Sequence, residues 1–292
     1  MDLTSAQNPR IKHLLSLQQK SSLRREEGLF VVEGQRELHH CLAAGYQLHS
    51  LFVCPELAGS FSVPSSPLGA SGVSASSSSP LGASAGTAEV FTLPRSLYER
   101  MAYRGSTEGV IAIVRERRLS LSALLPSSLA AGGFPARPAS APPLFIILES
   151  VEKPGNLGAV LRSADAAAAT AVIVCDPLTD LYNPNLIRAS IGAIFTVPTV
   201  ACTTAECIAF LKQHDIQILT AQLQDSHPYY DTPMTGPTAI VMGTESTGLT
   251  DAWRQAATAH IRIPMLGRLD SLNVSVSAAI LLFEAVRQRT IQ

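Results

Sequence analysis

Long apolar runs are missing from this sequence. No stretch of the 292 residues approaches the roughly 18 uninterrupted apolar residues that a membrane-spanning helix needs. The first residues, MDLTSAQNPRIKHLL, lack the apolar core of a secretory signal. The net charge is −1, which argues against a polybasic tail for nucleic acid but leaves room for a local basic face. We therefore expect a cytoplasmic protein with no membrane attachment.

Cysteine is scarce as well, and its spacing is unlike that of a metal site. The five cysteines are odd in number, show no CxxC pair, and several lie in apolar runs such as AVIVCD. We interpret them as reduced, mostly buried small hydrophobic residues. Because no group of cysteine and histidine residues has the spacing of metal ligands, we expect no metal and no zinc site. The cysteines are Cys41, Cys54, Cys175, Cys202 and Cys207.

Phosphate-binding loops are also missing. The sequence contains no GxxxxGK[ST] segment and no GxGxxG segment at a predicted strand-to-helix turn. A nicotinamide-dependent or nucleoside-triphosphate-dependent enzyme is therefore disfavoured. No Ser-His-Asp arrangement is indicated either, since the seven histidines lie outside the three loops described below.

The composition divides the chain into two candidate domains. Residues 57–88 are rich in Ser, Gly, Ala and Pro and contain SSPLGAS twice, which predicts a flexible insert in the first domain. Residues 120–143 form a second stretch of this kind, which predicts a linker. We expect domains over 1–119 and 144–292, because a chain of this length typically forms about two.

Both domains alternate predicted strands and helices, which is typical of α/β folds. The first has about four strands. The second has short apolar strands separated by helices, which predicts a mostly parallel sheet with helices on both faces and ligands at the carboxyl ends of its strands. The predicted strands are 29–32, 48–54, 90–93, 110–114, 144–149, 171–175, 195–199, 216–221, 238–242 and 260–263. The predicted helices are 11–17, 35–43, 95–102, 157–168, 185–191, 203–213, 250–257 and 274–290.

The first strand-end loop lies in FIILESVEKPGNLGAVLRSADAA. A strand ends at Glu149, and a helix whose N-terminus favours an anion starts near Leu157. Asn156 either caps this helix or faces the crevice at the strand ends. Arg162, six residues on, shares that crevice with Asn156 only if Asn156 lies in the loop; otherwise it is an ordinary exposed helical arginine.

Two further loops follow the strands 238–242 and 260–263. In TAIVMGTESTGLTDAW, Gly243 lets a ligand approach the backbone, and Glu245 either caps the next helix or serves the site. In IPMLGRLDSLNVS, Ser271 or Asn273 can cap the helix 274–290. A cap needs one such residue, so the surplus of polar groups beside an apolar helix indicates a binding site.

Taken together and in this order, the three loops resemble the SpoU (TrmH-like) family of RNA 2′-O-ribose methyltransferases, in the SPOUT superfamily. Each motif alone is modest, but three in order with a strand before each are specific, and they cover residues 144–290. The start of the chain, TSAQNPRIKHLLSLQQKSSLRREEGLFVVEGQREL, resembles more weakly the RNA-binding domain (L30e-like) that precedes the catalytic domain in many members. The three motifs are Asn156-x-Gly158-Ala159-x-x-Arg162-x-Ala164, Val241-Met242-Gly243-x-Glu245-x-x-Gly248, and Ile263-Pro264-Met265-x-Gly267 followed by Ser271-Leu272-Asn273-Val274-Ser275.

This resemblance implies a fold and a cofactor. In the family, the C-terminal segment threads through a loop and makes a deep trefoil knot, an exception to the rule against threaded chains. The knot holds S-adenosyl-L-methionine largely by main-chain contacts, and members are homodimers with the site completed near the partner chain. The matching cofactor-binding positions here, with Leu223 added as a further wall, are Leu223, Met242, Gly243, Gly248, Ile263, Met265 and Leu272.

The resemblance also implies catalytic roles in methyl transfer to a ribose 2′-hydroxyl of ribosomal or transfer RNA. Arg162 is a poor general base, so it clamps the hydroxyl and stabilises the alkoxide, or an RNA phosphate takes the proton. Asn156 orients the ribose or Arg162. Lys153 stands where many members have Asp, so the role of that position stays open. The remaining pocket residues are Glu245, which also could hold Arg162, Ser271 and Asn273.

Two other functions stay open. A catalytically silent RNA-binding or ribosome-assembly protein could have the same fold, although the joint presence of Asn156, Arg162, Glu245, Ser271 and Asn273 disfavours it. A small-molecule enzyme with a doubly wound nucleotide-binding fold is disfavoured by the missing phosphate loops.

Overall fold

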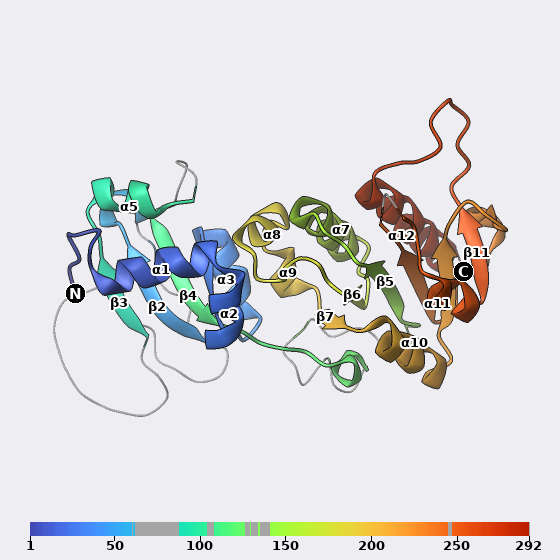
Figure 1. The fold of residues 1–292 in the computed structure, drawn as a ribbon, viewed down its shortest axis with the longest axis horizontal. Helices are drawn as coiled ribbons and strands as arrows, with labels where there is room; N and C mark the ends of the chain where they lie inside the picture. Colours follow the sequence, from blue (N-terminus) through green and yellow to red (C-terminus); the bar gives the residue numbers. More distant parts are fainter. Residues whose placement is uncertain are drawn as a thin grey trace. The chain divides into compact units, whose positions relative to one another are not determined.

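The computed structural model describes residues 1–59, 61, 88–103, 108–125, 129, 134, 141–244 and 247–291. Packing divides the chain into two compact units. The first comprises Met1–Arg117 and Tyr182–Phe195, and the second comprises Arg118–Leu181 and Thr196–Gln292 (Figure 1). The expected division at 119 and 144 did not foresee that Tyr182–Phe195 packs with the first unit.

The first unit has a four-stranded sheet in the order β1-β4-β2-β3, with β4 antiparallel to β1 and β2, and β3 parallel to β2. The four predicted strands are therefore present. Its strands are β1 (Leu29–Glu33), β2 (Leu48–Val53), β3 (Glu89–Thr92) and β4 (Val110–Arg115). Its helices are α1 (Pro9–Gln19), α2 (Ser21–Glu27), α3 (Gln35–Ala43), α4 (Pro55–Ala58), α5 (Arg95–Met101) and α8 (Pro184–Ala189), with α9 (Ala193–Thr196) at its last boundary.

An aromatic residue fixes the segment 182–195 within the first unit. The ring of Tyr182 stacks on Phe30 of β1 with 4.3 Å between centroids, and its hydroxyl donates to the Arg117 carbonyl at 2.6 Å. Burial raises the pKa of this phenol, so the hydroxyl keeps its proton and can donate.

The predicted insert 57–88 falls mostly outside the described residues, which exclude 60 and 62–87. At its ends, α4 continues through Ala58, and β3 begins at Glu89. The expectation of a flexible insert stays a prediction.

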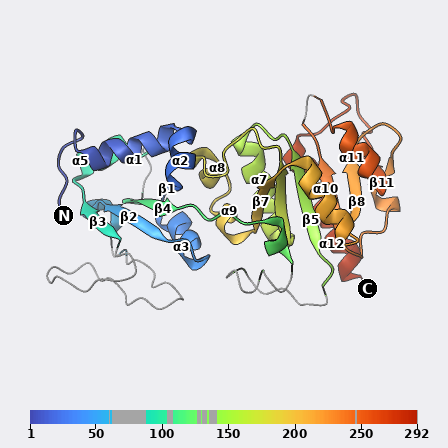
Figure 2. The ribbon, with the colours of Figure 1, turned by 60° about the horizontal axis from the view of Figure 1, so that its bottom comes forward.

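The second unit has a seven-stranded sheet in the order β7-β6-β5-β10-β8-β11-β9, and all its strand pairs are parallel (Figure 2). The prediction of a mostly parallel sheet flanked by helices is confirmed; the knot stays a prediction. Its strands are β5 (Leu144–Glu149), β6 (Ala171–Cys175), β7 (Thr199–Cys202), β8 (Gln217–Ala221), β9 (His227–Pro228), β10 (Thr238–Met242) and β11 (Ala259–Arg262). Its helices are α7 (Pro154–Ala166), α10 (Thr204–Gln213), α11 (Asp251–Ala256) and α12 (Val274–Thr290), with short 3-10 helices η1 (Leu121–Leu124) and η2 (Tyr229–Asp231).

Helices cover both faces of this sheet because side chains alternate along each strand. Phe145 and Ile147 of β5 join a buried core with Phe210 of α10 and Trp253 of α11. Helices α7 and α12 pack against each other and contact β6 and β10 (Figure 1). None of the helices in the described residues is both long and apolar enough to cross a membrane.

Two predicted elements need correction. The predicted strand 195–199 is wrong: residues 193–196 are helical in α9, and β7 begins only at Thr199. Pro198 has no N–H for a strand ladder, so the strand starts after it. In the predicted linker 120–143, the described residues Leu124, Leu129 and Phe134 are buried in the core of the second unit.

Candidate functional site

A cavity of about 450 Å³ lies at the carboxyl ends of β8, β10 and β11. The loops that follow these three strands form its walls, where a parallel sheet is expected to bind ligands. All seven residues predicted to bind the cofactor line this one cavity. They are Leu223, Met242, Gly243, Gly248, Ile263, Met265 and Leu272.

Close backbone packing shapes the wall that follows β10. A Cβ atom on Gly243 would lie 2.2 Å from the carbonyl carbon of Gly248, so no side chain fits there. Gly248 has a φ of +69°, a conformation that favours glycine. Its N–H donates to the Thr244 carbonyl at 3.1 Å and closes the turn. The cavity wall at this turn is therefore main chain. Glu245, the remaining predicted residue of this loop, lies outside the described residues.

Asn273 accounts for part of the polar surplus before α12. Its Oδ1 accepts from the backbone N–H of Ser275 at 2.9 Å and from the Ser275 hydroxyl at 2.6 Å, so Asn273 is the N-cap. Its Nδ2 donates to Oδ1 of Asn156 at 3.2 Å. The side-chain amide of Asn273 thus caps α12 and also hydrogen-bonds Asn156, which links the third loop to the first. Ser271 is exposed and lines the large cavity.

Asn156 lies inside α7 rather than before it. Pro154 occupies the first turn, where its missing N–H costs nothing, and the N-cap position falls on Lys153. The interpretation of Asn156 as the helix cap is therefore wrong. Asn156 lines a second cavity of about 170 Å³, beside the segment from Glu149 to Lys153. Gly243, Thr244 and Val274 line both cavities, which places the two side by side.

Arg162 stands apart from the other predicted catalytic residues. It lies six residues after Asn156 on the same helix, about 240° further around the axis at about 100° per residue, so the two do not share a face. Its side chain is exposed and lines neither cavity. Across the part of the chain that the structure describes, no hydrogen bond or ion pair involves its guanidinium group. The structure therefore does not bring Arg162 to Asn156 within one chain.

Glu149 is a site residue that sequence reasoning missed. Its buried carboxylate accepts from the Thr250 N–H at 2.9 Å, the Thr250 hydroxyl at 2.7 Å and the Thr204 hydroxyl at 3.2 Å. Thr204 is the first residue of α10 and Thr250 is the N-cap of α11. The carboxylate of Glu149, which lines the smaller cavity, therefore hydrogen-bonds the N-termini of two helices. The available signal was a carboxylate ending the apolar strand LFIILE.

Gln222 was also missed. Its Nε2 donates to the Gln224 carbonyl at 2.9 Å, and the residue lines the large cavity. Its Oε1 is buried and has no hydrogen-bond partner among the described residues. Because buried polar atoms are nearly always paired, this acceptor suits a donor group on a bound ligand.

Comparison with known proteins relates this arrangement to a family. The model of the SpoU rRNA Methylase family matches residues 143–283, and that of the MRM3-like substrate binding domain matches residues 8–112. A 23S rRNA (guanosine-2'-O-)-methyltransferase RlmB from Yersinia pestis is 38% identical over 186 residues, which cover 63% of this chain and 72% of that protein. The chain belongs to the SpoU family. The resemblance inferred from the three motifs is thereby confirmed.

Other SpoU relatives extend this result. The RlmB protein of Vibrio vulnificus is 43% identical over 150 residues, 51% of this chain and 61% of that protein. A crystal structure described as an RNA 2′-O ribose methyltransferase is 34% identical and has a TM-score of 0.73, with 99% of this chain and 100% of that chain covered. An AdoMet-bound rRNA methyltransferase from Sinorhizobium meliloti, 24% identical with a TM-score of 0.79 and 98% and 97% coverage, shows the same fold.

Proposed function

We propose that this protein transfers the methyl group of S-adenosylmethionine to a ribose 2′-hydroxyl of ribosomal RNA in the cytoplasm. The observation that carries the proposal is that the loops after β8, β10 and β11 meet at one cavity, which all seven predicted cofactor positions line. The RlmB relatives, named as 23S rRNA methyltransferases, favour ribosomal RNA over transfer RNA. The MRM3-like domain at residues 8–112 supports a role for the first unit in holding RNA.

The large cavity fits the chemistry of this cofactor. Its wall at Gly243 and Gly248 is main chain, which suits polar edges of a nucleoside, and Met242 and Leu272 offer apolar contact. Gln222 supplies the buried acceptor for an amino or hydroxyl donor. When bound, S-adenosylmethionine supplies a methyl group already activated on a sulfonium, so no metal is required.

The protein's own contribution is to position and polarise the ribose hydroxyl. Asn156 and Asn273 form a joined pair of amides at the smaller cavity, which we assign to orienting the ribose. Arg162 stabilises the developing alkoxide, because a guanidinium donates but does not accept protons at neutral pH. Its exposed position supports a site that only bound RNA or a second copy of the chain completes.

A homodimer through α12 would provide such completion. Val276 and Phe283 are each 47% exposed and lie seven residues apart, close to two helical turns, so they share one face of the helix. Exposed apolar residues in register on one helix mark an association surface. Since α12 packs against α7, which carries Arg162, this surface lies near the exposed catalytic candidate.

Methyl transfer from tritiated S-adenosylmethionine tests the activity directly. We expect label to enter ribosomal RNA from a strain that lacks the enzyme, at a ribose that becomes resistant to alkaline cleavage. Label in transfer RNA alone would correct the substrate. Cofactor binding by a folded protein without transfer to any cellular RNA would favour the catalytically silent RNA-binding protein instead.

A further inference from the structure

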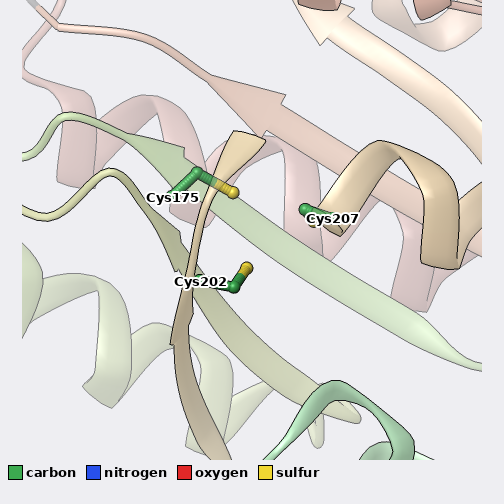
Figure 3. Close-up of side chains that lie close together, drawn as sticks. All are labelled: Cys175, Cys202 and Cys207. Atoms are coloured by element: carbon green, nitrogen blue, oxygen red, sulfur yellow. The ribbon is translucent and has the colours of Figure 1, made fainter. Parts of the chain in front are cut away.

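Three cysteines, from two neighbouring strands and the helix that follows the second strand, meet at one edge of the second unit. Cys175 ends β6 and lies directly opposite Cys202, the last residue of β7, in the strand register. Cys207 lies near the start of α10. Their three sulfur atoms all lie within 4.8 Å of one another (Figure 3). Strand pairing brings Cys175 to the other two cysteines of this thiol cluster, and spacing along the chain does not show this contact.

A helix begins directly after one of the three cysteines. Cys202 immediately precedes Thr203, the N-cap of α10, so the positive end of the helix dipole faces this part of the chain. Cys175 and Cys207 are buried, whereas Cys202 is partly exposed. The cluster therefore lies at the border of the apolar core, with one of its three residues only partly buried.

We propose that the thiol cluster binds one thiophilic divalent ion of the zinc class. Zinc–sulfur bonds of about 2.3 Å in a tetrahedral site need sulfur atoms about 3.8 Å apart, so the present spacing requires only a small contraction. Three cysteines leave the fourth position of a tetrahedral site for a water molecule.

The charge balance favours a divalent over a monovalent ion. Three thiolates with a divalent ion leave a net charge of minus one, whereas a monovalent ion such as Cu(I) leaves minus two, which is more costly to bury. On binding, each S–H bond that is still present breaks, a metal–sulfur bond forms in its place, and the proton leaves to the buffer.

Cobalt(II) is the probe that tests this site. The full-length protein is reduced, freed of metal with a chelator and titrated with Co²⁺, which we expect to bind with one equivalent and an intense thiolate-to-cobalt charge-transfer band. Zn²⁺ should then displace the cobalt and abolish the band. Cys202→Ser should weaken Co²⁺ binding by at least about 100-fold, because loss of even an outer-shell partner costs about 10- to 100-fold.

Cys54→Ala is the matched control, because Cys54 is a buried free cysteine of the first unit, outside the cluster. It should bind Co²⁺ as the wild-type protein does. Circular dichroism checks that Cys202→Ser is folded, and Cys207→Ala gives a second, independent loss of a ligand. The proposal is overturned if reduced wild-type protein takes up no Co²⁺, if both cluster variants bind as wild type, or if only Cu(I) binds.

Discussion

The large cavity and the exposed side of the α7–α12 pair differ in how complete they are. Within one chain, the cavity already collects all seven predicted cofactor positions, and its wall is fixed by the contact between Gly243 and Gly248. The α7–α12 side carries an exposed arginine without an ion pair among the described residues, and two exposed apolar side chains, Val276 and Phe283. The cavity is formed within one chain, whereas we propose that the α7–α12 side is completed by RNA or by a second copy of the chain.

This difference separates binding from catalysis. Cofactor affinity should depend on the backbone fit of the cavity and be nearly independent of α7. Methyl transfer should depend on both regions, because the 2′-hydroxyl must meet the cofactor and the guanidinium together. Variants of the two regions should therefore affect cofactor affinity and turnover differently.

Arg162→Ala is expected to give the largest effect. Removal of one hydrogen-bond donor at a developing oxyanion slows catalysis by about 100- to 1000-fold. The affinity for S-adenosylmethionine, measured by calorimetry, should stay within about twofold, since Arg162 lines neither cavity. Arg162→Lys, which keeps the charge without the planar fork, should recover part of the turnover. Near-normal turnover in Arg162→Ala would remove Arg162 from the mechanism.

Phe283→Glu should dissociate the proposed homodimer. Burial of a phenylalanine side chain is worth about 1.5–3 kcal/mol, and a two-fold interface contains it twice, so the dissociation constant should rise by about 100-fold or more. Analytical ultracentrifugation measures this shift. Leu178→Glu, at a leucine that is 64% exposed and outside α12, is the control and should leave the dimer unchanged. A wild-type protein that is monomeric at high concentration would contradict the expectation.

Gly243→Val should weaken cofactor binding by about 10- to 100-fold, because the added atoms overlap the backbone of Gly248 and overpacking costs about 1–3 kcal/mol. Gly267→Ala is the control, since a Cβ at Gly267 meets nothing within 4 Å. Calorimetric titration with S-adenosylmethionine compares the two, with a thermal melt to confirm folding. Equal affinities would show that this close contact does not shape the binding wall.

Asn273→Asp should give the smallest effect. The aspartate keeps the acceptor that caps α12 but loses the Nδ2 donor to Asn156, so turnover should fall about fivefold, equivalent to one hydrogen bond of about 1 kcal/mol. The melting temperature should hold, because a negative charge suits a helix N-terminus. In contrast, Asn273→Ala should lose about 1 kcal/mol of unfolding free energy with the cap. A lower melting temperature in Asn273→Asp would assign Asn273 a purely structural role.

The strands and the last helix of the second unit were predictable where an apolar run has clear polar ends. β5, β6, β10 and α12 have the predicted bounds to the residue. The predicted strand 195–199 was wrong because a short apolar run is compatible with either a helix or a strand. Here a short helix precedes the proline and the strand follows it.

The candidate site was predictable only in part. The cofactor wall came from the second and third motifs, with Leu223 added, and the meaning of these motifs depends on resemblance to a family rather than on periodicity. The start of α7 was placed too late, because Pro154 was assigned to the loop although proline is favoured in a first helical turn. Glu149 and the thiol cluster depend on which strands are neighbours, and no spacing along the chain records that order.

The position of Glu149 has one further consequence. Its carboxylate bonds Thr204 of α10, the helix that carries Cys207, and Thr250, which follows the Gly248 turn of the large cavity. Glu149 thus connects, through hydrogen bonds, the helix of the proposed metal site with the segment that follows the proposed cofactor wall. If binding at one site changes the affinity at the other, the coupling free energy must be the same in both directions. Binding of a metal ion at the thiol cluster would then be measurable as a change in the affinity for the cofactor, and binding of the cofactor as a change in the affinity for the metal ion.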